Sequence, residues 1–340
     1  VVIADEATFN EEHLYECRET LQNVLSDSVY NVRVCFGIYR TDNMNESLSF
    51  MCDKASFAVA SIKDDTHSFI AYYDDTMLEA AIKYKTIVDE FDDAIKAGEF
   101  KMYLQPQISA KTRRLTGAEA LVRRIKPDGT IISPIDFIPV YEKSGLISRL
   151  DRYIWEQAAA KLGEWKKAGI NMSISVNISP KDFYYIDIFN TFAGLIKKYD
   201  IEPSNLKIEI TETTIMSDVP NLMGELEELR KAGFTLEMDD FGSGYSSLNT
   251  LKDINVDVLK VDMGFIKETK NVKKSRIILA SVIKMAKELN LLIITEGVET
   301  EEQVDNLTKL GCDVFQGYYF SKAIDVNEFE KRYLYRKKAG

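Results

Sequence analysis

The sequence predicts an α/β protein in which a (β/α)8 TIM-like barrel follows a small N-terminal α/β fragment. The 340 residues, 45% of them hydrophobic, are enough for one barrel plus an appendage. From residue 172 onward, short apolar runs alternate with helical patterns, as in a parallel α/β fold. Most of these runs carry or end in a polar side chain, which is typical of the functional face of such a barrel.

Residues 1–75 contain short patterns of both strand and helix. The strand-like segments are 1–6, 31–39 and 68–73, and the helical ones are 11–25 and 47–60. A long helical pattern over 76–98 then ends at Gly98, a residue that favours helix ends, and we interpret it as the connector between two domains. This organisation predicts a partial α/β domain over 1–75 and a barrel domain over 99–340.

The barrel region opens with two strands, 101–109 and 114–123, joined by a polar turn. A helix begins at Pro134 after the N-cap Ser133, and another spans 150–168. Strands and helices then alternate. The expected strands are 172–177, 206–211, 234–239, 256–261, 291–295 and 313–316, and the expected helices are 187–199, 220–232, 272–289 and 300–309. Six β/α repeats and two opening strands give eight strands, the number in a TIM-like barrel.

The composition excludes several kinds of function. A net charge of −11 argues against duplex nucleic-acid binding, which depends on basic surface. The two histidines, His13 and His67, lie far from the acidic segments, which argues against histidine metal clusters and Ser-His-Asp catalysis. The four cysteines show no CxxC pairing and are expected to be reduced thiols. We find no membrane-spanning run in this segment and expect a cytoplasmic protein. The chain lacks an initial Met, which leaves upstream sensor or membrane segments open.

Seven apolar runs place metal-competent or polar side chains where strands are expected. These side chains are Glu119, Asn177, Glu209, Glu212, Asp239, Asp240, Lys260, Asp262, Glu296, Glu299 and Gln316. Strand ends converge on one face of a parallel α/β fold, so we expect them to share a pocket. Carboxylates packed this closely repel one another unless cations neutralise them. The sequence therefore predicts a divalent-metal site.

The ordered segments EALVR, SVNIS, EITE, DDFGSGYSSL, LKVD, EGVE and QGYYFSK resemble the EAL-domain family of cyclic-di-GMP phosphodiesterases. The resemblance runs from about residue 90 to about residue 333. It implies a metal-dependent enzyme of bacterial signalling that hydrolyses cyclic di-GMP to linear pGpG. It also implies two ions, Mg²⁺ or Mn²⁺, per site, which suits carboxylate and amide ligands.

By this resemblance, Glu119, Asn177, Glu209 and Asp239 hold the first metal. Asp239 bridges to a second metal, which Asp240 and Glu296 help to hold. A hydroxide between two metals about 3.5–4 Å apart attacks phosphorus. Lys260 contacts that water and either orients it or takes its proton, and cations nearby can lower its pKa. Catalytic roles therefore fall on Lys260, Glu119, Asp239 and Asp240.

Other residues are expected to contact the substrate or to brace the site. Arg123 suits a non-bridging phosphate oxygen. Asp262 points to the same side of its strand as Lys260, and Gln105 and Gln316 are further candidate substrate contacts. Glu212 and Glu299 are expected to brace neighbouring loops. Glu237 adds a charge on the strand face of Asp239, near the expected barrel mouth, and the sequence does not indicate its role.

Residues 1–75 resemble the back half of a GGDEF domain. The segments that resemble this domain are VVIADE, VRVCFGIYR and CDKASFAVASIK. The GGDEF signature itself is absent from the chain. We therefore expect no cyclase activity from this region. In the EAL family, the loop that corresponds to 240–247 lies near the metals and the dimer interface, so we also expect a homodimer.

Each site residue also has a structural interpretation. Glu119 can be an ordinary salt-bridge residue, Asn177 a helix or turn cap, and Lys260 one half of an ion pair. Two further functions remain open beside the phosphodiesterase. One is a noncatalytic receptor for cyclic di-GMP, although receptors of this kind usually lack some of the ligands or the lysine. The other is a metal-dependent barrel acting on a different small phosphodiester.

Overall fold

The computed structural model forms two compact units, Val1–Glu90 and Phe91–Gly340. The residues that it describes are 2–25, 33–41, 43, 45–63, 65, 67–217, 219–242, 251–252, 254–262 and 272–335. None of the helices in these ranges is long and apolar enough to cross a membrane.

The first unit is a small α/β assembly. Its elements are α1 (Glu11–Leu25), β1 (Phe36–Ile38), α2 (Leu48–Ser61), β2 (Ile70–Tyr72) and α3 (Asp75–Asp89). Strands β1 and β2 pair in parallel, and Ala58 of α2 is completely buried. The strand expected at 1–6 is wrong, because residues 2–5 have no regular structure and residues 6–8 form a turn. Val2 and Ile3 are 92% and 76% exposed, so this apolar run has no sheet to join.

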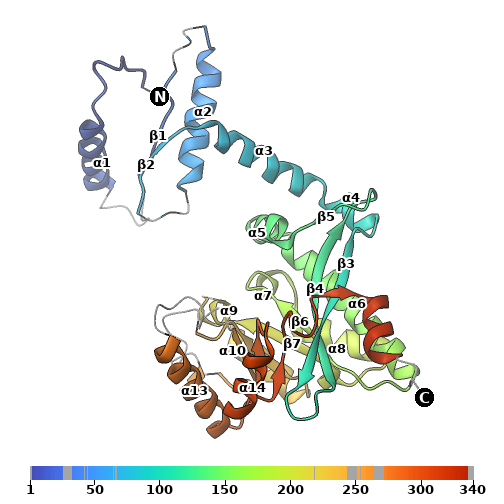
Figure 1. Cartoon of the computed structure of the whole chain (residues 1–340). Helices are drawn as coiled ribbons and strands as arrows, with labels where there is room; N and C mark the ends of the chain where they lie inside the picture. Colours follow the sequence, from blue (N-terminus) through green and yellow to red (C-terminus); the bar gives the residue numbers. More distant parts are fainter. Residues whose placement is uncertain are drawn as a thin grey trace. The chain divides into compact units, whose positions relative to one another are not determined.

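The second unit begins with a short helix and contains the barrel (Figure 1). Its first half consists of α4 (Phe91–Lys96), β3 (Phe100–Ser109), β4 (Leu115–Ile125), β5 (Ile131–Ile132), α5 (Pro134–Ser144), α6 (Ile147–Lys167), β6 (Ile174–Ile178), α7 (Asp182–Tyr185), α8 (Ile188–Tyr199) and the 3-10 turn η1 (Pro203–Asn205). Its second half consists of β7 (Leu206–Thr211), α9 (Glu212–Met216), α10 (Leu222–Lys231), β8 (Leu236–Asp239), β9 (Val258–Asp262), α13 (Val272–Glu288), β10 (Leu292–Glu296), α14 (Glu301–Leu310), β11 (Val314–Phe315), β12 (Ile324–Asp325), α15 (Val326–Phe329) and the π-helical turn η2 (Glu330–Leu334).

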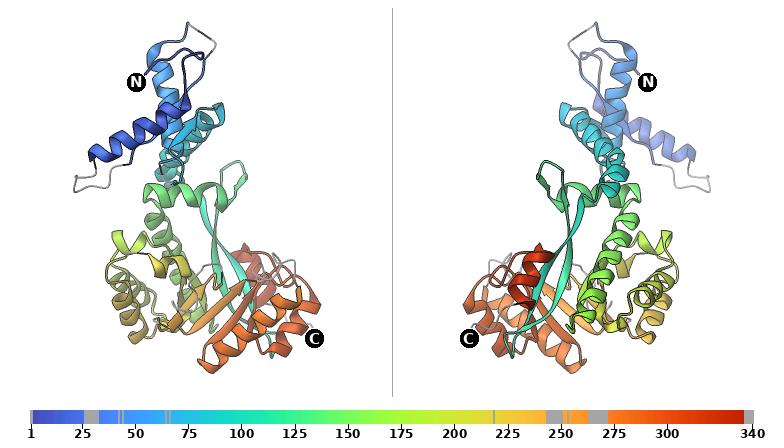
Figure 2. Two further views of the ribbon diagram at one scale, coloured as in Figure 1. Left: turned by 90° about the vertical axis from the view of Figure 1, so that its left-hand side faces the viewer. Right: turned by 90° about the vertical axis from the view of Figure 1, so that its right-hand side faces the viewer.

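Within the described residues, eight strands close into a barrel in the order β3-β11-β10-β9-β8-β7-β6-β4, with β3 pairing back to β4. This confirms the predicted barrel, but with one difference in strand direction. Strand β3 runs antiparallel to both β4 and β11, because a short turn joins it directly to β4 as a hairpin. The long β3–β4 hairpin is visible from two sides in Figure 2.

The barrel strands show two different faces. Outward-facing residues such as Val176 and Ile208 are completely buried, and Trp155 and Ala158 of α6 belong to the same buried set. Inward-facing residues are polar toward the carboxyl ends of the strands. Deeper inside, Val258, Ile294 and Val314 form a buried apolar cluster. Because side chains alternate along a strand, one face supports the fold and the other is free to carry chemistry.

Candidate active site

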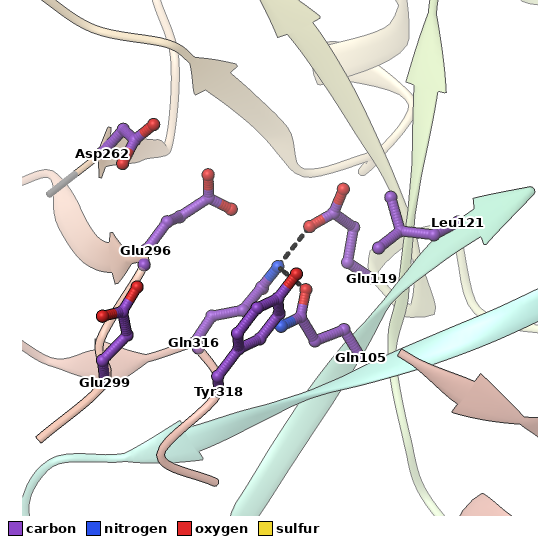
Figure 3. A pocket seen from close by; sticks show the side chains of 10 residues that line it. Gln105, Glu119, Leu121, Asp262, Glu296, Glu299, Gln316 and Tyr318 are labelled. Carbon is purple, nitrogen blue, oxygen red and sulfur yellow. Dashed lines mark hydrogen bonds between the residues drawn. The ribbon is translucent and has the colours of Figure 1, made fainter. Parts of the chain in front are cut away.

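Four carboxylates from different strands meet inside the barrel. They belong to Glu119 on β4, Glu209 on β7, Asp239 on β8 and Glu296 on β10. Carboxylate oxygens of Glu119, Glu209 and Glu296 lie within 4.8 Å of one another. Figure 3 shows Glu119 and Glu296 pointing toward the same space from different strands. Residues that are up to 177 positions apart in the sequence (296 − 119) are thus brought together by the barrel.

The ammonium group of Lys260 lies among these carboxylates. Lys260 belongs to β9 and is completely buried. Its Nζ lies 2.7 Å from Oε1 of Glu296 and 3.3 Å from Oδ1 of Asp239. The same atom lies 3.5 Å from Oε2 of Glu119 and forms an ion pair with Glu209. One cation of the protein is therefore shared by four anions.

This cluster carries an excess of negative charge. Four carboxylates against one ammonium leave three negative charges when all five groups are ionised. Burial, followed by the charges of Glu296 and Glu119, raises the pKa of Asp239 well above its ordinary value. Burial also raises the pKa of Glu296 to about 7, although Lys260 opposes the shift. The site is therefore electrostatically strained by its own carboxylates.

Lys260 responds to its carboxylate neighbours by holding its proton more tightly. Burial lowers the pKa of Lys260, but the charges of Glu119 and Glu296 and the hydrogen bonds to them together raise it by more, and the net shift is upward. The lowered pKa that we considered for this lysine requires bound cations, because the protein's own groups act in the opposite direction.

The donor atoms in the cluster fit a divalent cation. Glu209 has no solvent exposure, and its Oε2 accepts no hydrogen bond from the described residues. A buried carboxylate oxygen without a partner costs free energy that a bound cation removes. All of the donors here are carboxylate oxygens, which hard cations such as Mg²⁺ and Mn²⁺ prefer.

Three further residues that we expected in the site lie close to these carboxylates. Asn177 on β6 is in register with Glu209 on β7, and the indole of Trp155 donates to the Asn177 carbonyl oxygen at 2.9 Å. Asp262 is in register with Glu296 at the ends of β9 and β10. Asp240 has a φ of +56°, a backbone conformation that most residues avoid. Partial burial and the charges of Asp262 and Glu119 raise the pKa of Asp240.

A chain of glutamine side chains lies beside Glu119. Nε2 of Gln316 donates to Oε2 of Glu119 and also to Oε1 of Gln105, at 3.3 Å for the second bond. Nε2 of Gln105 donates to the Ser321 carbonyl oxygen at 3.2 Å. A residue that the sequence analysis missed, Gln107, donates to Oε1 of Gln316 at 3.3 Å. The two-residue spacing of Gln105 and Gln107 along one strand could have indicated that they share a face.

A cavity of about 410 Å³ opens onto this cluster. Its lining includes the expected residues Gln105, Glu119, Asp262, Glu296, Glu299 and Gln316. It also includes Tyr318, which the sequence analysis missed, and Figure 3 shows this ring beside Gln105. The backbone N–H of Glu299 donates to Oε1 of Gln303 at 2.7 Å, so the Gln303 side chain ties the Glu299 backbone to the start of α14.

Arg123 and Glu212 are absent from the described lining of this cavity. Arg123 lies two residues beyond Leu121 on β4 and donates to the Val122 carbonyl oxygen at 2.7 Å. Glu212 is buried at the start of α9, directly after its N-cap Thr211. The loop over 240–247, which we expected near the metals, falls mostly outside the described residues, because residues 243–250 are not described.

Glu237 does not lie at the barrel mouth. Its side chain is completely buried and forms an ion pair with Nζ of Lys207 at 2.8 Å. Lys207 and Glu237 each lie two residues before a member of the carboxylate cluster, Glu209 and Asp239, on the same strand faces. The pair therefore forms a second charged layer inside the barrel, next to the carboxylate cluster.

Carboxylates around one buried lysine, open to a cavity inside an α/β barrel, define a barrel protein with an acidic cluster that could hold a metal ion. The chain belongs to the EAL-domain family, whose model matches residues 88–323.

Individual relatives share the same region. The probable cyclic di-GMP phosphodiesterase PdeG of Escherichia coli (strain K12) is 36% identical over 252 residues, 72% of this chain and 48% of PdeG. The signaling protein YkoW of Bacillus subtilis (strain 168) is 34% identical over 278 residues, 82% of this chain and 35% of YkoW. The chain thus spans less than half the length of either relative.

A solved structure similar to this chain is that of the PaMucR phosphodiesterase in complex with c-di-GMP. Its TM-score is 0.67 at 32% identity, and the match covers 72% of this chain and 99% of that one. The barrel of this chain therefore matches almost all of that phosphodiesterase structure.

Proposed function

We propose that this protein is a metal-dependent phosphodiesterase that hydrolyses cyclic di-GMP. Water adds to phosphorus and one ring P–O bond breaks, so that the cyclic dinucleotide becomes linear pGpG. The observation that carries the proposal is the cluster of Glu119, Glu209, Asp239 and Glu296 around the buried Lys260, open to a cavity of about 410 Å³. Relatives named as cyclic di-GMP phosphodiesterases support the choice of substrate.

Two ions, Mg²⁺ or Mn²⁺, would be held by the carboxylates and one amide. Glu119, Asn177, Glu209 and Asp239 are the proposed ligands of the first ion. Asp239, Asp240 and Glu296 are the proposed ligands of the second. When bound, such ions supply positive charge to the phosphate and activate water at neutral pH.

The chain's own residues would hold the substrate and manage protons. Lys260 keeps its proton beside Glu296 and Asp239, so its ammonium can orient an attacking water or stabilise a developing negative charge. Gln105, Gln316 and Asp262 line the cavity and are the proposed substrate contacts. Arg123 would reach a phosphate oxygen only after its side chain turns away from the Val122 carbonyl.

Three further proposals concern the whole protein: its oligomeric state, its location and the origin of its first unit. We propose a homodimer in the cytoplasm, and a front unit that derives from a GGDEF-like domain. The parallel β1–β2 pair with α2 against it is compatible with that origin. These proposals are separate from the chemistry of the barrel, and an incorrect one would leave the active-site assignment unchanged.

The deciding experiment is incubation of the purified chain with cyclic di-GMP and Mg²⁺ or Mn²⁺, with the products separated by chromatography. We expect linear pGpG, and no product after chelation. Tight binding of cyclic di-GMP with no pGpG would favour the noncatalytic receptor. Equal turnover of cyclic di-AMP, run as a matched substrate, would favour a barrel that acts on small cyclic phosphodiesters in general.

A further inference from the structure

Gln107 is a buried side chain close to the active site that does not line the cavity. Its exposed fraction is 1%, and it lies on β3 two residues after Gln105. Its Nε2 donates to Oε1 of Gln316 at 3.3 Å. A completely buried amide must form hydrogen bonds, because burial of a polar side chain without them costs free energy.

The donors and acceptors in the row of hydrogen bonds from Gln107 through Gln316 to Glu119 are set at its Glu119 end. Oε2 of Glu119 accepts the hydrogen bond at this end, so Gln316 presents its Nε2 there. Oε1 of Gln316 then faces the opposite way, toward Gln107, and only a donor can satisfy it. The amide of Gln107 supplies that donor.

The opposite strand leaves space for Gln107. Gly117 on β4 is its register partner. A Cβ atom at Gly117 would lie 2.9 Å from Oε1 of Gln107 and 2.7 Å from Oγ of Ser173. Any larger residue at Gly117 would therefore have to displace the Gln107 side chain, its neighbour Ser173, or both.

We propose that Gln107 is a positioning residue for the metal site: it fixes the amide of Gln316 so that Nε2 faces Glu119. This inference rests on the proposed metal-dependent function. Without a donor at position 107, Oε1 of Gln316 loses its partner, so the Gln316 side chain is no longer held from that side and can shift toward another donor. Glu119 then loses the hydrogen bond from Gln316 that holds it in place. Partners of metal ligands commonly change metal affinity by about 10–100-fold when they are removed.

The test is Mn²⁺ affinity, measured by calorimetry on the metal-free chain, for the wild type and for Gln107→Met. Met keeps the shape of Gln but has no N–H donor. We expect Mn²⁺ to bind about tenfold or more weakly to the variant. A matched control is Gln157→Met on α6, because Gln157 is a partly buried glutamine that bonds to the backbone of Met102 and Phe100. That variant should lose thermal stability but keep wild-type Mn²⁺ affinity.

A double-substitution cycle separates positioning from a general effect on the fold. In a Gln316→Met background, Gln107→Met should cause no further loss of Mn²⁺ affinity, because its target is gone. Equal losses in both backgrounds would overturn the inference. Gln107→Leu, which also has no donor, serves if the Met variant does not fold, and it should weaken Mn²⁺ binding by a similar factor.

The outcomes also separate this inference from the proposed function. If the wild type binds Mn²⁺ and Gln107→Met binds it equally well, the positioning role is wrong and the metal site stands. If the wild type binds no Mn²⁺, the proposed metal-dependent function fails and the inference fails with it.

Discussion

The ammonium of Lys260 lies 2.7 Å from a carboxylate oxygen of Glu296 inside a barrel that exposes none of the Lys260 side chain. Three more carboxylates contact the same ammonium. The protein thus assembles more buried negative charge than it can neutralise. This imbalance makes substitutions here change stability and metal binding in opposite directions, and the predictions for Glu119 and Lys260 depend on that contrast.

Glu119→Ala should lower turnover of cyclic di-GMP by orders of magnitude while the fold persists. The change removes a proposed metal ligand and also relieves repulsion within the cluster. The metal-free variant should therefore melt at a higher temperature than the metal-free wild type, although it binds Mn²⁺ more weakly. Melting temperature in EDTA, Mn²⁺ affinity and turnover would be measured together. A lower melting temperature with unchanged specific activity would indicate that Glu119 is a structural residue.

Divalent cations should control the activity. Mg²⁺ or Mn²⁺ should support hydrolysis, and EDTA should abolish it, because the donors in the site are oxygen atoms. Ca²⁺ should bind but support little turnover, since it coordinates loosely and acidifies water less. Initial rates after exhaustive chelation and after addition of each ion test this. Full activity in the chelated enzyme would rule out a metal-dependent mechanism.

An acid pair outside the metal site, with one member completely buried, should make stability depend on pH. Asp182, at the start of α7, is completely buried, and burial raises its pKa from 3.8 to about 6. The backbone N–H of Ser179 opposes the shift by donating to Oδ2 at 2.7 Å. Asp151 forms a pair with it, and burial followed by the charge of Asp182 raises the Asp151 pKa further.

The sign of the effect follows from proton binding. Between about pH 4 and pH 6 the folded state keeps a proton on Asp182 that the unfolded chain releases, so stability falls as pH rises through this range. Asp182→Asn should therefore stabilise the protein above about pH 6, by at most about 3 kcal/mol, and flatten the dependence. Chemical unfolding from pH 4 to pH 8 in EDTA measures this. A variant with the wild-type slope would contradict the assignment to Asp182.

The ion pair of Lys207 and Glu237 should matter for stability. Glu237→Gln leaves the Lys207 ammonium without its carboxylate partner, a loss of about 3–5 kcal/mol for a fully buried pair and less here, because Lys207 is 18% exposed. Replacing both residues with Met should recover much of the loss. The matched control is Asp92→Asn, which breaks the exposed Arg149–Asp92 pair and should cost about 0–1 kcal/mol. Equal losses for the two single variants would show that the barrel pair has no special role.

The sequence predicted the barrel well because its strands carry a strong local signal. Strands such as Leu206–Thr211 are apolar on the outward face, and Gly or polar turns separate them from helices. The prediction of a strand at 1–6 was wrong because its apolar residues have no sheet to join. A local sequence pattern does not indicate whether a neighbouring strand is present.

The site residues divide in the same way. The approach of Glu119, Glu209 and Glu296 follows from the convergence of parallel strands, so the sequence could predict it. The roles of Glu237 and Gln107 could not be predicted, because each depends on a partner at a distant position. Glu237 pairs with Lys207 across β7 and β8, and Gln107 reaches Gln316 through the antiparallel pairing of β3 with β11.

Lys260→Ala should lower turnover severely while leaving the affinity for cyclic di-GMP near normal, because the loss falls on the transition state. It also leaves four carboxylates, two buried and two partly buried, without their shared ammonium, so the metal-free variant should melt at a lower temperature. Mn²⁺ should restore more of that stability in the variant than it adds to the wild type, because the ion then supplies the only positive charge in the cluster.

Lys260→Arg distinguishes catalysis from ion pairing at the same position. Arg keeps the positive charge, so it should recover part of the metal-free melting temperature. It should not restore turnover, because its planar fork does not fit a completely buried Lys site and aims its N–H donors differently from the ammonium that would orient the attacking water. Turnover, substrate affinity and melting temperature for both variants separate the two roles. Substantial turnover in Lys260→Arg would assign Lys260 a purely electrostatic role, and near-normal turnover in Lys260→Ala would remove it from the mechanism.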